Sequence, residues 1–238
     1  MKNRSELAKY FAELGFKVGA EVGVYRGDYS AELCANNPEL KLYCIDSWGT
    51  PLPGKGEGVD KKNAFRKAQK LLAPYNCELI KKFSMDAVKD FEDNSLDFVY
   101  IDADHHYPLV RNDIREWAKK VHKGGIVSGH DYITSRMLNS DLGVMRAVDE
   151  YVAKHGCKLE LTGFGQSGND HESPASLRSG YLLPSLRREK NPSRRPHSLW
   201  RRETEAKYSS LSSTGLRPWF FAKGDKDYAP SWWFMKLH

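Results

Sequence analysis

The sequence contains no long hydrophobic run. No stretch of about 18 consecutive apolar residues occurs, the length that a helix needs to cross a bilayer. Residues 1–6 also lack the apolar segment of a secretory signal. The 238 residues, 40% hydrophobic and 29% charged, suffice for one domain with a buried core. These observations predict a cytoplasmic protein that does not contact a membrane.

Cysteine is scarce, with four in the chain and none in a C-x-x-C pair. Structural zinc sites and disulfide scaffolds both depend on closely spaced cysteines. We therefore expect neither, and we expect reduced thiols that behave as small apolar side chains. The four residues are Cys34, Cys44, Cys77 and Cys157.

A basic surface spread over the whole chain is absent as well. The net charge is +6, but residues 172–216 hold nine Lys/Arg and four Asp/Glu and so supply +5 of it. Because the remainder is nearly neutral, the charge does not predict nucleic-acid binding.

The basic stretch lies in a region rich in Ser, Arg and Pro. This composition buries little apolar surface, and it predicts a largely irregular or disordered insertion at 165–228. The expected core then comprises residues 1–164 and a last strand within 229–238. The insertion is either a tolerated surface segment or a basic arm that contacts an acidic substrate or nucleic acid.

The fingerprint of a dinucleotide-binding fold, G-x-G-x-x-G, is missing. The chain instead has Glu21-x-Gly23-x-x-x-Gly27, between an expected strand at 17–22 and an expected helix at 28–36. Glycines let backbone N–H groups approach a ligand, and a helix start adds unpaired donors and a positive dipole end. An acidic residue in this turn would repel a pyrophosphate but suits a ligand that carries cationic groups.

A carboxylate ends the next expected strand. Asp46 directly follows the apolar residues of 41–45, where it can accept hydrogen bonds from a ribose diol. The turn and Asp46 together predict a nucleoside-type ligand across the ends of two parallel strands.

Strands and helices alternate along the first 160 residues, which is typical of a parallel sheet covered by helices on both faces. The clearest strand is 96–101, whose apolar run fits a central position. The other expected strands are 77–81, 126–128, 157–162 and 231–236, and the other expected helices are 4–14, 60–73, 85–91, 107–120 and 142–154.

Two polar clusters follow neighbouring strands. Ile101-Asp102-Ala103-Asp104-His105-His106-Tyr107 comes after the clearest strand, and Gly129-His130-Asp131-Tyr132 comes after the next one. With the glycine turn, these motifs make residues 1–162 resemble the class I S-adenosylmethionine (SAM)-dependent methyltransferases, and in particular a subfamily that acts on small molecules. The resemblance implies a Rossmann-like α/β fold, with a seven-stranded, mostly parallel sheet in the order 3-2-1-4-5-7-6.

The resemblance also implies which residues bind SAM. Asp46 would hold the ribose, and Met85 or Asp86 would face the adenine. Ser84 is expected to cap the helix that contains both, and Trp48 either flanks the adenine or covers the core. The full set of expected cofactor-binding residues is Glu21, Gly23, Val24, Gly27, Asp46, Ser84, Met85, Asp86 and Asp102.

Transfer to a hydroxyl requires removal of its proton. His105 is the expected catalytic base, with Asp102 as a second catalytic residue. Alternatively, a divalent cation, Mg²⁺ or Mn²⁺, would be held by Asp102, His130 and Asp131. Structural roles compete with both, and Asp104 is expected only to cap helix 107–120.

The predicted function is SAM-dependent methylation of a hydroxyl oxygen on a small molecule. RNA or protein methylation is an alternative, although the Asn/Asp-Pro-Pro-Tyr motif of many amino-methylating enzymes is missing after strand 96–101. A non-catalytic SAM- or nucleotide-binding domain is another. Monomer and homodimer both remain open.

Overall fold

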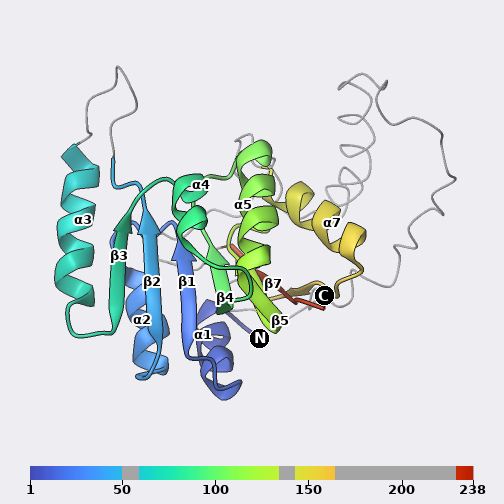
Figure 1. The fold of residues 1–238 in the computed structure, drawn as a ribbon, viewed down its shortest axis with the longest axis horizontal. Helices are drawn as coiled ribbons and strands as arrows, with labels where there is room; N and C mark the ends of the chain where they lie inside the picture. Colours follow the sequence, from blue (N-terminus) through green and yellow to red (C-terminus); the bar gives the residue numbers. More distant parts are fainter. Residues whose placement is uncertain (50–58, 134–142, 164–228, 238) are drawn as a thin grey trace, which may run out of the picture. The chain divides into compact units, whose positions relative to one another are not determined.

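The computed structural model describes residues 1–49, 59–133, 143–163 and 229–237 (Figure 1). The described strands form one seven-stranded sheet in the order β3-β2-β1-β4-β5-β7-β6. The predicted fold class is thereby confirmed. Among the described helices, none is long and apolar enough to cross a membrane. The insertion predicted at 165–228 lies outside the described residues.

The first five strands run parallel, and β7 runs antiparallel to both β5 and β6. Parallel neighbours need long crossover connections, and helical segments of the chain supply them here. The strands are β1 Val18–Val22, β2 Lys41–Asp46, β3 Cys77–Lys81, β4 Leu96–Ile101, β5 Val121–Gly129, β6 Glu160–Leu161 and β7 Trp232–Met235.

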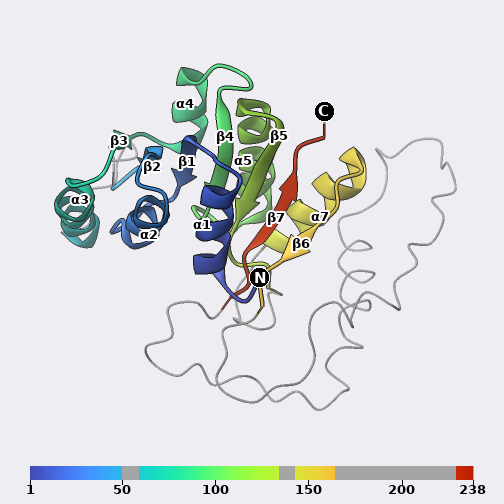
Figure 2. The same cartoon turned by 90° about the horizontal axis from the view of Figure 1, so that it is seen from below.

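Helices cover both faces of the sheet (Figure 2). One buried cluster joins the sheet to α1, α2 and α3, and a second joins it to α4, α5 and α7. The helices are α1 Arg4–Glu13, α2 Asp28–Asn36, α3 Val59–Leu72, α4 Ser84–Ala87 with the 3-10 turn η1 Val88–Asp90, α5 Tyr107–Lys120 and α7 Val144–His155.

Strand β4 fixes the location of the site. Its side chains are almost all buried, and it pairs with β1 on one side and β5 on the other. The strand order reverses between β1 and β4, because the chain builds the sheet outward in both directions from that point. In open α/β sheets ligands bind where the order reverses, at the carboxyl ends of the strands.

The fifth strand is longer than predicted. The sequence predicts a helix at 107–120 and a strand at 126–128, and the structure confirms the bounds of the helix. Helix α5 ends at Lys120, and β5 begins at once and pairs Val121 with Leu96 before a shift of register. A Cβ on Gly125 would lie 2.3 Å from the Asp97 carbonyl oxygen, so glycine here permits close pairing.

Candidate functional site

The glycine turn follows β1 and lies between the ends of β2 and β4. The Gly23 N–H donates to the Ile45 carbonyl over 2.8 Å, and the Asp102 N–H donates to the Val22 carbonyl over 2.7 Å. Gly23 has a φ of +101°, and a Cβ on it would lie 2.0 Å from the Asp102 carbonyl oxygen. Any side chain at this position would therefore displace the chain that follows β4.

Gly27 ends the turn and is the N-cap of α2, with a φ of +83°. Its N–H donates to the Val24 carbonyl over 2.9 Å, while the Val24 side chain is buried against the core. The first turn of α2 therefore starts at the carboxyl edge of the sheet, where its N–H groups and positive dipole end favour polar or anionic ligand atoms.

Asp46 connects the glycine turn to the end of β2. One carboxylate oxygen accepts the Tyr25 N–H over 2.8 Å, and the other accepts the Trp48 N–H over 2.7 Å. Tyr25 has a φ of +52°, an unusual conformation that this bond helps to hold. Because a carboxylate oxygen has two lone pairs, Asp46 can bind a ribose hydroxyl as well.

Trp48 belongs to the core. Its side chain is buried, its ring packs on Phe65 with centroids 4.7 Å apart, and its Nε1–H donates to the Tyr25 carbonyl over 2.7 Å. The sequence leaves open whether Trp48 flanks the adenine or covers the core, and the structure confirms that it covers the core.

Glu21 is the fourth residue of β1, inside the strand predicted at 17–22, and it precedes the turn itself. The side chain is 2% exposed, and its carboxyl accepts a hydrogen bond from the Ser30 hydroxyl of α2. Burial raises the pKa of Glu21 to about 8, although the bond from Ser30 opposes the shift. The carboxyl is therefore mostly neutral at pH 7 and offers no anionic charge to a cationic ligand.

Ser84, Met85 and Asp86 follow β3, at the same edge as Asp46. The N-cap of α4 is Phe83, so the prediction that Ser84 caps this helix was wrong. The Ser84 hydroxyl instead donates to Asp113 and accepts a hydrogen bond from Trp117 Nε1, both on α5. Met85 is half-buried against the core, and Asp86 is exposed beside Lys89.

Three polar side chains meet beyond the ends of β4 and β5. The Nε2 atom of His105 lies 2.6 Å from Asp131 Oδ2 and 3.5 Å from Asp102 Oδ1. One ligand atom from each of these residues lies within 4.8 Å of the others. Both His105 Nε2 and Asp131 Oδ1 are buried without a hydrogen-bond partner of acceptable geometry. We call Asp102, His105 and Asp131 the DHD cluster.

The charges within the DHD cluster shift the pKa of its members. Hydrogen bonding to Asp102 and Asp131 raises the pKa of His105 to about 10, although burial opposes this. Burial would raise the pKa of Asp131, but His105 and His130 beside it hold that pKa well below its usual range. The DHD cluster thus favours the protonated form of His105, in which the ring cannot act as the predicted base.

His130 is not part of the DHD cluster, contrary to the predicted metal site. Its Nδ1 atom lies 3.2 Å from the far oxygen of Asp131, Oδ1, and its side chain is only 6% exposed. The His130 carbonyl accepts a hydrogen bond from Trp232 Nε1 of β7 over 3.1 Å. Asp131 has a φ of +57°, so the chain turns sharply here and directs the two side chains differently.

The sequence predicts that Asp104 caps α5. The structure differs, because Asp104 does not accept a hydrogen bond from an N–H in the first turn of this helix. The N-cap is His106, and Asp104 accepts both the backbone N–H of His106 over 2.8 Å and its ring Nδ1 over 2.7 Å. This local turn before the helix places His106 in an exposed position and leaves His105 facing the carboxylates.

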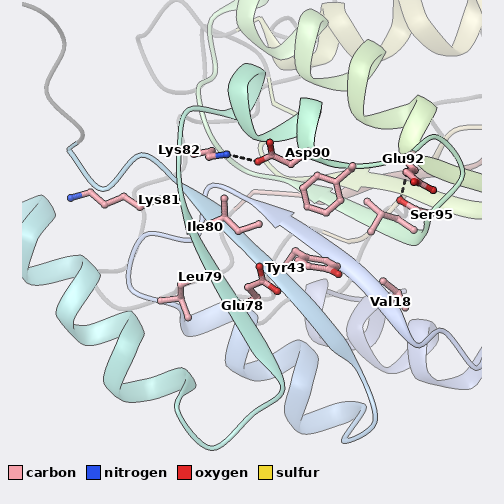
Figure 3. Close-up of a pocket in the computed structure, with 12 residues that line it drawn as sticks. Val18, Tyr43, Glu78, Leu79, Ile80, Lys81, Lys82, Asp90, Glu92 and Ser95 are labelled. Atoms are coloured by element: carbon pink, nitrogen blue, oxygen red, sulfur yellow. Dashed lines mark hydrogen bonds and ion pairs between the residues drawn. The ribbon is translucent and has the colours of Figure 1, made fainter.

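A cavity of about 660 Å³ lies beside β3, away from the DHD cluster (Figure 3). Tyr43 and Ile80 line it on the sheet, and the ion pair between Lys82 and Asp90, 2.5 Å long, lies at its edge. None of the predicted site residues lines this cavity.

Sequence reasoning did not foresee the partners that hold the site residues. Ser30, Asp113 and Trp117 fix Glu21 and Ser84, yet each lies 9 to 33 positions from its partner. The only sequence signal is that Asp113 and Trp117 are four residues apart and so share one face of α5.

The sheet order, the glycine turn and the polar residues after β4 and β5 define a Rossmann-like methyltransferase fold. An O-methyltransferase family protein from Burkholderia thailandensis shares this fold with a TM-score of 0.52 at 16% identity, covering 68% of this chain and 52% of its own. A putative caffeoyl-CoA O-methyltransferase from Staphylococcus aureus has a TM-score of 0.51 at 14% identity, covering 66% and 77%. An O-methyltransferase from Bacillus cereus, solved in complex with SAH, has a TM-score of 0.50 at 11% identity, covering 66% and 72%.

Residues 20–132 match a family model described as "Methyltransferase domain". An uncharacterized protein of Acanthamoeba polyphaga mimivirus is 33% identical over 138 residues, which are 56% of this chain and 58% of the relative. Residues 20–132 are thus similar to a methyltransferase domain, and the chain spans a little over half the length of that curated relative.

Proposed function

We propose that this chain transfers the methyl group of SAM to a hydroxyl oxygen of a small molecule. The observation that carries the proposal is the arrangement at one edge of the sheet. The glycine turn and Asp46 lie at the ends of β1 and β2, and the DHD cluster lies at the ends of β4 and β5. The O-methyltransferases that share the fold support oxygen as the acceptor atom.

The reaction is an in-line displacement. The acceptor oxygen attacks the methyl carbon, the carbon–sulfur bond breaks, and the sulfonium leaves as a neutral thioether. The protein must hold the two reacting atoms about 3–3.5 Å apart and in line. In our proposal, Asp46 binds the ribose, and the backbone of Gly23, Val24 and Gly27 forms the surface against which the rest of the cofactor lies.

The DHD cluster has a donor set that fits a divalent cation. Two carboxylates and one imidazole converge, and one ligand atom from each lies within 4.8 Å of the others. Asp102, His105 and Asp131 would hold the ion, and the imidazole favours Mn²⁺ over Mg²⁺. When bound, such an ion lowers the pKa of a hydroxyl that it contacts.

Without the ion, the proton on His105 offsets the charge of one of the two carboxylates. A protonated ring cannot accept the proton of the acceptor hydroxyl. The Asp102 side chain is 24% exposed against 9% for Asp131, so Asp102 is the carboxylate that an acceptor reaches first. We therefore assign proton acceptance in this state to Asp102, with His105 as its charge partner.

The first test measures cofactor binding and methyl transfer with the same proteins. We expect SAM to bind the wild type in calorimetry, and Asp46→Ala to raise the Kd by about tenfold or more, because the ribose loses a charged hydrogen-bond acceptor. Methyl-labelled SAM should label small hydroxyl compounds such as catechols, sugars or hydroxy acids, with little label on RNA.

The matched control is Glu39→Ala, an exposed carboxylate on the other end of β2 that pairs with Lys17. This variant should bind SAM as the wild type does. Absence of SAM binding by the folded wild type would overturn the proposal, and label on RNA alone would overturn the small-molecule acceptor.

The second test concerns the cation. Mn²⁺ should raise the melting temperature of the wild type, and EDTA should suppress methyl transfer until Mn²⁺ or Mg²⁺ is restored. Asp131→Asn should lose most of the Mn²⁺-dependent shift, because one charged ligand is removed.

Asp104→Asn removes a neighbouring carboxylate outside the DHD cluster and should keep the shift. If methyl transfer is unaffected by EDTA and Mn²⁺ changes no melting temperature, the cation is ruled out and Asp102 remains the proton acceptor.

A further inference from the structure

Three cysteines that are far apart in the sequence lie together between α2 and the sheet. Cys34 is on the inner face of α2, Cys44 is in β2, and Cys77 is the first residue of β3. The sulfur atoms of Cys34 and Cys77 are 3.5 Å apart, although 43 positions separate the residues in the chain. All of these thiols are free.

The three thiols differ in access to solvent. Cys34 and Cys44 are buried, with 2% and 0% exposure, whereas Cys77 is partly exposed. A solute can therefore reach Cys77 first, and the thiol of Cys34 is already in contact with it from the protein side.

The electrostatic environment also favours reaction at Cys77 before Cys34. Hydrogen bonds from Cys34 and Cys44 lower the pKa of the Cys77 thiol, and Lys41 acts in the same direction. Hydrogen bonding to Cys77, together with burial, raises the pKa of Cys34. Since the thiolate is the reactive form, this environment and the partial exposure of Cys77 both favour Cys77 as the nucleophile of the pair.

We propose that Cys77 and Cys34 form a redox-active pair, in which Cys77 reacts with a peroxide or a small disulfide and Cys34 resolves the product to an intramolecular disulfide. With hydrogen peroxide, the Cys77 thiolate attacks one oxygen and the O–O bond breaks, so that Cys77 becomes a sulfenic acid and the departing hydroxide takes up a proton to form water. The Cys34 sulfur then attacks the Cys77 sulfur and a second water leaves, so that the two thiols are oxidised by two electrons and the peroxide is reduced.

The approach needed for bond formation is short. A disulfide has an S–S length of about 2.05 Å, so the two sulfur atoms must close from 3.5 Å. Rotation of the Cys77 side chain at the start of β3 supplies such a movement, because this side chain is not fully packed.

The disulfide would join the last turn of α2 to the first residue of β3, at the edge of the sheet opposite the cofactor turn. Ser30, which binds Glu21, lies one helical turn before Cys34 on α2, so the two residues share the inner face of the helix. The bond would thus fix the helix that begins at Gly27, whose N-terminus faces the proposed cofactor site.

The test treats the reduced full-length protein with hydrogen peroxide or oxidised glutathione, then blocks remaining thiols and analyses the protein by mass spectrometry. We expect the loss of two hydrogen atoms in the intact mass, a peptide that links Cys34 to Cys77, and reversal by dithiothreitol. Cys157→Ser, which removes the cysteine outside the cluster, should give the same linked peptide.

Cys77→Ser should abolish the product, and Cys34→Ser should stop the reaction at a Cys77 sulfenic acid or a glutathione adduct, each variant first shown to be folded by circular dichroism. If either variant fails to fold, the cysteine linkage found in the unmutated protein alone tests the proposal. A Cys34–Cys77 peptide supports the proposal. Unmodified Cys77, a Cys77–Cys44 peptide, or Cys77 oxidised to sulfinic acid without a disulfide overturns it.

Discussion

Polar side chains near the cofactor turn fall into two groups. Glu21 and Ser84 have their hydrogen-bonding groups occupied by neighbours within the protein. In the DHD cluster, by contrast, the side chains pair, within the part of the chain that the structure describes, only with one another and with His130, and all of these partners can change their charge. Because a cation displaces protons from its ligands, these are the groups whose pairing a bound ion is expected to replace.

At the residue scale, Glu21 gives the first prediction. Its pKa is about 8 in the folded protein against 4.5 as the ordinary value, so the folded state holds its proton where the unfolded state does not. The stability from this group is complete below about pH 4.5 and is lost as pH rises through 8, on the order of 4 kcal/mol in all. Glu21→Gln should flatten this dependence in urea unfolding at pH 5 and pH 8, and it should leave the Kd for SAM at pH 7 within about threefold of the wild type.

The control is Glu13→Gln, an exposed side chain at the end of α1, which should unfold with the wild-type pH dependence. A large loss of SAM affinity in Glu21→Gln at neutral pH would show that a carboxylate charge reaches the cofactor, in agreement with the prediction from sequence and against the buried, neutral group.

At the element scale, the connection from β1 to α2 is the part that the sequence describes best. Gly23 and Gly27 both have positive φ, and the tight approach at Gly23 comes from the chain after β4. The spacing of the two glycines predicts the turn. The reason that no side chain fits at Gly23 is a contact with Asp102, 79 positions away.

Gly23→Ala is the corresponding prediction. The new Cβ would lie 2.0 Å from the Asp102 carbonyl oxygen, in a conformation that L-residues rarely adopt. We expect a loss of about 3 kcal/mol or more in the free energy of unfolding, measured by urea denaturation.

Gly124→Ala provides the matched comparison, because Gly124 also has a positive φ, +86°, but no atom lies within 4 Å of its Cβ position. Strain alone should cost this variant about 1 kcal/mol. Equal losses for the two variants would mean that the contact with Asp102 is unimportant.

At the scale of the whole molecule, the described site residues all lie between positions 21 and 131. The antiparallel strand β7 comes from the far end of the chain and lies between β5 and β6 in the sheet. The segments on either side of the predicted insertion meet in the sheet. Thr162 and Ser231 exchange two hydrogen bonds of 2.9 Å. A short connection can therefore replace a long one between β6 and β7.

Deletion of residues 172–216 should consequently leave the Kd for SAM within about twofold of the wild type and the melting temperature nearly unchanged, measured by calorimetry and thermal unfolding. A matched deletion in the core, such as removal of β7, should abolish folding, because β5 would lose its antiparallel partner. A large loss of SAM affinity on deleting 172–216 would show that the insertion takes part in the site.

The α/β class, the turn and the position of Asp46 could be predicted from the sequence. Their signals are alternating apolar segments, glycines and carboxylates at the ends of strands, which depend on residues close together in the chain. The sheet order came with the family resemblance, and the structure confirmed it. The tertiary structure alone decided that Glu21 is buried, that His105 rather than His130 faces Asp102 and Asp131, and that Cys34 meets Cys77. Each of these depends on side chains from separate elements, whose proximity, charge and burial arise only when the sheet and its helices pack together.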